Sequence, residues 1–69
     1  MVVEWEDGFE IAVSIDSGKA VISGNKEGLL SLAKQLAALA EDSPGSHIHY
    51  DEDKSLDTGS DELIVEKTA

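Results

Sequence analysis

The fold depends on residues 24–41, GNKEGLLSLAKQLAALAE, because this stretch alone has the periodicity of a helix. Its apolar residues recur at spacings of three and four, which predicts one helix over residues 26–41 with an apolar stripe facing a core. Asn25 is a suitable N-cap, and Pro44 with Gly45 ends the helix. The expected stripe consists of Leu29, Leu32, Ala33, Leu36, Leu39 and Ala40.

A hairpin is predicted at the start of the chain. Residues 3–5 and 9–15 alternate apolar and polar side chains, as in strands with one buried face. The Asp7-Gly8 pair between them is typical of a hairpin loop, with the glycine in the left-handed conformation. A three-residue loop would place Trp5 against Phe9 on the apolar face, and Trp5 then fits either the core or an interface.

Three further strands complete the expected sheet. A turn at residues 16–18 precedes a strand at 20–22, residues 47–51 alternate around the fourth, and residues 63–65 form the fifth. The order βββαββ predicts an α+β fold: a two-layer sandwich with one helix packed on a four- to five-stranded, mostly antiparallel sheet. We expect residues 1–69 to form a single domain whose second sheet face is open.

The composition is strongly acidic. Fifteen Asp and Glu residues face five Lys and no Arg, for a net charge of -10. Such a field repels nucleic acids and anionic membranes and speeds encounter with basic partners. No apolar stretch approaches the roughly 20 residues of a membrane helix. The chain also lacks a secretory signal and cysteine, so we expect a cytoplasmic protein.

His47, His49 and Asp51 are the sharpest candidates for a chemical site. A strand would project these side chains from one face, and two imidazoles with a carboxylate can bind a metal. The same residues are also ordinary on a solvated strand face. Neither a nucleophile motif nor an enclosed acid–base pair is found, so we expect neither catalysis nor a cofactor.

Four segments together resemble the immunity protein 32 family. They are residues 24–33, Leu36 with residues 39–41, residues 44–51 and residues 59–67. The most specific pieces are the His-x-His-x-Asp run from His47 and the Gly-Ser pair at Gly59 that precedes Glu-Leu-Ile. The resemblance implies a small protein of bacterial polymorphic-toxin systems that neutralises a cognate toxin, and it implies no catalytic residue.

We therefore expect a monomer or weak dimer that binds a toxin with a basic surface. The expected contact combines the open sheet face and the acidic loop after it: Glu10, His47, His49, Tyr50, Asp51, Glu52, Asp53 and Asp57. Two alternatives stay open, a small metal-binding domain that uses His47, His49 and Asp51, and a generic acidic adaptor.

Overall fold

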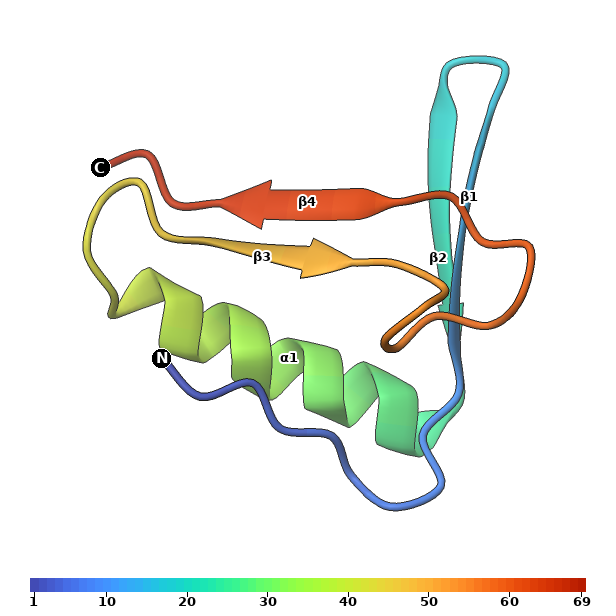
Figure 1. The fold of residues 1–69 in the computed structure, drawn as a ribbon, viewed down its shortest axis with the longest axis horizontal. Coiled ribbons are helices and arrows are strands. Elements are labelled where there is room, and N and C mark those ends of the chain that lie inside the picture. The colour runs from blue at the N-terminus through green and yellow to red at the C-terminus, as the bar shows by residue number, and fades with distance from the viewer.

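The computed structural model describes all 69 residues and contains one helix and four strands (Figure 1). In chain order they are β1 (Ile11–Asp16), β2 (Lys19–Gly24), α1 (Lys26–Ala40), β3 (His47–Tyr50) and β4 (Leu63–Glu66). The predicted α+β class and the helix are confirmed. The single four- to five-stranded sheet is wrong, because β1 pairs antiparallel with β2 and β3 with β4 in two separate sheets.

The β1–β2 hairpin closes through a tight turn. Asp16 pairs with Lys19, and the intervening Ser17 and Gly18 both have positive φ values, 51° and 76°. This is the geometry that matches the twist of a two-residue hairpin. The turn predicted at residues 16–18 is therefore confirmed, and the hairpin extends away from the rest of the molecule as an arm (Figure 1).

A loop, residues 57–61, occupies the outer edge of β1. Asp61 N donates to Val13 O at 2.8 Å, and its carboxylate accepts from Ile15 N at 2.7 Å. Ser60 Oγ accepts from Val13 N at 3.2 Å. Because this loop satisfies backbone groups that a neighbouring strand would otherwise bond, β3 and β4 cannot join β1 there, and two sheets result.

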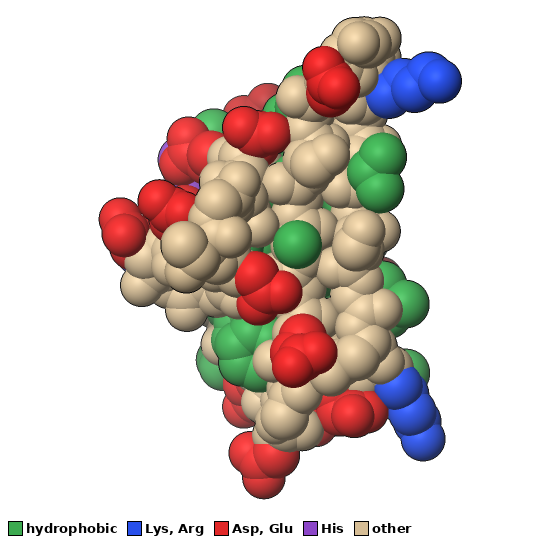
Figure 2. Space-filling model, turned by 90° about the vertical axis from the view of Figure 1, so that its right-hand side faces the viewer, with side chains coloured by type: hydrophobic (Ala, Val, Ile, Leu, Met, Phe, Trp, Pro, Cys, Tyr) green, Lys and Arg blue, Asp and Glu red, His purple; other side chains and the backbone are tan.

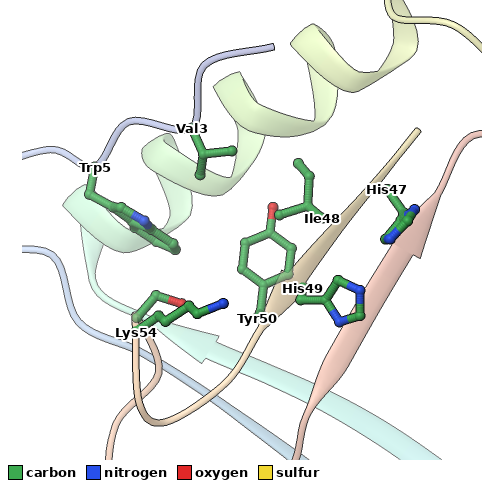
Figure 3. A pocket seen from close by; sticks show the side chains of 8 residues that line it. Val3, Trp5, His47, Ile48, His49, Tyr50 and Lys54 are labelled. Carbon is green, nitrogen blue, oxygen red and sulfur yellow. The ribbon is translucent and has the colours of Figure 1, made fainter.

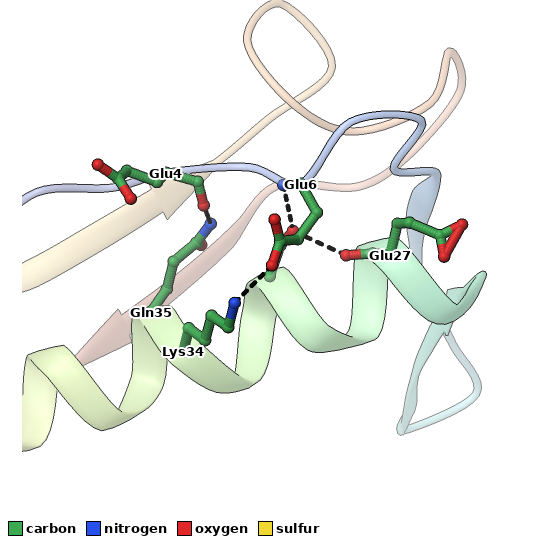
Figure 4. Close-up of polar contacts among 6 residues, drawn as sticks. Glu4, Glu6, Glu27, Lys34 and Gln35 are labelled. Carbon is green, nitrogen blue, oxygen red and sulfur yellow. Dashed lines mark hydrogen bonds and ion pairs between the residues drawn. The ribbon is translucent and has the colours of Figure 1, made fainter.

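The first ten residues, which we call the N-terminal segment, run beside α1 and form no strand (Figures 1 and 4). Ser31 Oγ accepts a hydrogen bond from Glu6 N at 2.8 Å, and Gln35 Nε2 donates to Glu4 O at 2.6 Å. Since helix side chains satisfy these backbone groups, residues 3–5 need no strand partner. The predicted order βββαββ is thus wrong, and the observed order is ββαββ.

Of the expected N-terminal hairpin, the structure contains only the turn, at residues 6–9. Phe9 N donates to Glu6 O at 3.2 Å, and Gly8 has a φ of 80°. Trp5 stacks on Phe9 with ring centroids 4.3 Å apart, so the predicted contact between these aromatic residues is confirmed. The turn reverses the chain from α1 towards β1 and does not connect paired strands.

Helix α1 is rotated relative to the predicted apolar stripe. Leu29 and Leu36 were expected in the core but are 49% and 38% exposed. Two polar residues take their place on the buried face, because Ser31 and Gln35 bond the N-terminal segment. The buried helix residues are Gly28, Ser31, Leu32, Gln35 and Leu39.

Asn25 joins the helix start to the N-terminal segment. Its Oδ1 atom accepts from Gly28 N at 2.8 Å, which confirms the predicted N-cap, and from Glu10 N at 2.9 Å. Its Nδ2 atom donates to Gly8 O at 2.9 Å. The backbones meet so closely that a Cβ atom added at Gly28 would lie 2.2 Å from Glu10 O.

The core lies between α1, the inner face of β3 and the start of β1. Tyr50 is 1% exposed, and its hydroxyl donates to Gln35 Oε1 at 2.9 Å. Burial raises the pKa of the Tyr50 phenol above its ordinary value. The other buried apolar residues are Ile11, Val13, Leu32, Leu39, Ile48 and Leu56. Helix α1 lacks the combination of length and apolarity that crossing a bilayer requires.

Candidate partner-binding surface

Strand β3 divides its side chains between the core and the surface. Ile48 and Tyr50 point towards α1 and are buried, whereas His47 and His49 leave the opposite face (Figure 3). The two imidazole rings lie with centroids 4.9 Å apart. The prediction that the two histidines share one exposed face is therefore confirmed.

Asp51 does not join the histidines. The strand ends at Tyr50, and Asp51 begins a turn in which its Oδ1 atom accepts from Lys54 N at 3.1 Å. The carboxylate beside His49 is that of Glu62, 3.6 Å from Nδ1. No cluster of three or more His, Cys, Asp or Glu side chains could hold a metal ion. The structure therefore does not bring together the three ligands of the metal-binding interpretation, His47, His49 and Asp51, because the chain turns after Tyr50.

The acidic loop after β3 is folded around an apolar anchor. Leu56 is 5% exposed, and Glu52 Oε2 accepts from Gly59 N at 2.8 Å across the loop. Asp51 and Glu52 thus hold the loop together. Asp53 and Asp57 are exposed, and their side chains make no hydrogen bond within the protein. Of the four loop acids expected at the contact, Asp53 and Asp57 are the ones free to meet a partner.

Glu10 and Asp57 lie together on the outer face of the β1–β2 hairpin. They line a shallow hollow of about 280 Å³ with Ala12, Ser23 and the helix start. Acidic side chains gather on this side of the molecule (Figure 2). Glu10 and Asp57 share this hollow, and Asp53 belongs to the same loop as Asp57; we call these three exposed acids the acidic face.

The expected contact residues thus fall into separate groups. Glu10 and Asp57 share one hollow, and the two histidines line another. Tyr50 contributes its ring to the core, where it meets Trp5 edge-on with centroids 6.1 Å apart. A partner could reach the Tyr50 hydroxyl only by opening the core.

A second hollow, which we call the β3 groove, was not predicted from the sequence. It has a volume of about 360 Å³ and lies between β3 and the N-terminal segment (Figure 3). Val3 and Trp5 form its far wall, and Lys54 with Ser55 lies at one end. The alternation of residues 3–5 indicated an extended segment, but nothing local indicated that it would face β3.

Comparison with models of known protein families gives one match. The model described as Immunity protein 32 matches residues 19–68, from the start of β2 to the residue before the last. Searches of curated proteins and of solved structures found no similar protein.

Proposed function

Because the chain belongs to the immunity protein 32 family, we propose that it neutralises a cognate bacterial toxin by binding it directly, without catalysis or a cofactor. The family match supports immunity as the role, and the charge of the chain supports the mode of binding. A net charge of -10 on 69 residues favours a partner with a basic surface. The absence of cysteine suits a cytoplasmic site of action.

We place the contact on the acidic face, and this placement is supported by what its side chains do in the free protein. Glu10, Asp53 and Asp57 are exposed, and no hydrogen bond within the protein involves their carboxylates. They therefore carry charge that does not stabilise the fold. Carboxylates placed in this way can meet Lys and Arg side chains without first breaking internal bonds.

The test is co-expression of this chain with a candidate toxin domain taken from the genes next to its own, followed by binding kinetics. Protection from growth arrest and a stable complex are the results expected of an immunity protein. Together, Glu10→Lys and Asp57→Lys should slow association by about tenfold at about 0.1 M salt, each alone by less, and both should reduce its salt dependence. The free energy of unfolding should change by less than about 0.5 kcal/mol, because neither side chain supports the fold.

Glu41→Lys is the matched control, since it makes the same change of charge at the far end of α1. The 15-residue helix separates the two sites by about 22 Å. Because screening limits the reach of exposed charges to about 10 Å at ordinary salt, Glu41→Lys should change association much less. Equal effects of Glu41→Lys and Asp57→Lys would show that only net charge matters and would remove the assignment to the acidic face.

A further inference from the structure

Strand β3 presents an unpaired backbone edge to the β3 groove. In an antiparallel pair, residues alternate between those that bond the partner strand and those whose N–H and C=O groups point to the other edge. Lys67 N donates to Ser46 O at 2.9 Å, which places Ser46 in the bonded set. By alternation, the backbone N–H and C=O groups of His47 and His49 point away from β4 and into the β3 groove.

The chain closes the corresponding edge of its other sheet but leaves this one open. On β1, residues 57–61 satisfy both outward groups of Val13 and the outward N–H of Ile15. On β3, no backbone bond outside the β3–β4 ladder involves His47 or His49. Strands β2 and β4 also border their sheets, but β3 is distinguished by a groove whose far wall is apolar, from Val3 and Trp5.

From this geometry we propose that the β3 groove binds an extended, basic segment of the toxin, which adds to the sheet as a third strand beside β3. This inference rests on the proposed function and names how the partner is held. Main-chain bonds to His47 and His49 would supply affinity, and alternate side chains of the added strand would face Val3 and Trp5.

The charge around the groove favours a basic occupant over a second copy of this chain. Glu62, just before β4, lies with its carboxylate 3.6 Å from His49 Nδ1, and Glu66, at the end of β4, is in register with His47. Lys54, at one end, is the single cation that lines the groove. A second copy would bring another net charge of -10 to the same place, which opposes pairing of two β3 edges.

The experiment compares His49→Pro with His49→Ala in binding to the toxin domain found by the co-expression test, purified in an inactive form. Both variants lose the imidazole, but only proline loses the outward N–H group and fills its place with a ring. We expect His49→Pro to bind at least about tenfold more weakly than His49→Ala, since it blocks strand addition. The two variants should unfold at similar urea concentrations, because the His49 N–H has no partner in the free protein.

Amide hydrogen exchange gives a second readout that needs no substitution. The His47 and His49 amides should exchange quickly in the free chain and become protected in the complex. A complex in which these amides stay unprotected, or in which the two His49 variants bind equally, overturns the strand-addition proposal alone. Failure to form any complex overturns the proposed function as well. Protection of the same amides in the free chain, together with dimers in sedimentation, would identify a second copy as the occupant and contradict the proposal.

Discussion

Helix propensity and this structure predict opposite effects of Gly28→Ala on the stability of the protein. In a solvated helix the change should stabilise the protein by about 0.5–1 kcal/mol, because glycine is a poor helix former. Here the new Cβ atom would lie 2.2 Å from Glu10 O, a backbone atom that cannot rotate away. The helix start and the N-terminal segment must therefore separate.

The expected loss of unfolding free energy comes from overpacking and from the hydrogen bonds that this separation strains. Overpacking costs about 1–3 kcal/mol. The bonds that Glu10 and Asn25 exchange, at 2.9 and 3.1 Å, contribute about 0.5–1.5 kcal/mol each and would lengthen. After the gain in propensity is subtracted, we expect a net loss of about 1–3 kcal/mol. In a domain of this size, each kcal/mol lowers the melting temperature by about 4–8 °C.

Urea unfolding followed by the fluorescence of Trp5, the only tryptophan, measures this loss. Ala37→Gly is the matched control, since Ala37 is exposed on the same helix and should lose about 1 kcal/mol through propensity alone. If Gly28→Ala is as stable as the original protein or more stable, while Ala37→Gly loses the expected amount, the close approach at Glu10 is refuted.

Three further predictions test the core and the histidine face. Leu32→Ala should cost about 2–5 kcal/mol of unfolding free energy, because Leu32 is 8% exposed, whereas Leu36→Ala, at a site 38% exposed, should cost about 1 kcal/mol. Equal losses in urea unfolding would contradict the orientation of α1. Since burial raises the pKa of Tyr50, the unfolded chain releases the phenolic proton first, so stability should fall as the pH rises above about 10. Tyr50→Phe should lack this part of the alkaline loss in pH-dependent melting. Calorimetry should detect no Zn²⁺ binding tighter than about micromolar, since His47 and His49 lack a third ligand; nanomolar affinity that is lost in His49→Ala would contradict this.

Features set by neighbouring residues could be predicted from the sequence. The helix, its Asn25 cap and the turn at residues 16–18 each depend on a few adjacent side chains, and all three are confirmed. The two-residue periodicity around Ile48 also placed β3 and its exposed histidines correctly. Such patterns report which face of an element is buried, whatever that element later packs against.

The pairing of strands could not be predicted in the same way. Alternation in residues 3–5 indicates an extended chain, but it does not show whether strand backbone or helix side chains will satisfy its hydrogen bonds. Ser31 and Gln35 are polar residues of the kind usually found at the surface, and they are buried because the N-terminal segment passes over them. Likewise, Ser60 and Asp61 belong to a polar loop by composition, yet they take the place of a strand beside β1.

The region matched by the family does not coincide with the proposed contact surfaces. Residues 19–68 include Asn25, which caps the helix, and Ser60, which bonds β1, so the matched region contains groups that hold the fold together. Residues 1–18 lie outside the match, yet they supply Glu10 to the acidic face and the Val3–Trp5 wall to the β3 groove. Each candidate surface therefore has one side inside the matched region and one side outside it. If the matched region provides a common scaffold and the proposed function holds, the choice of toxin would depend most on the N-terminal segment, where the exposed Val3 can change without altering the core.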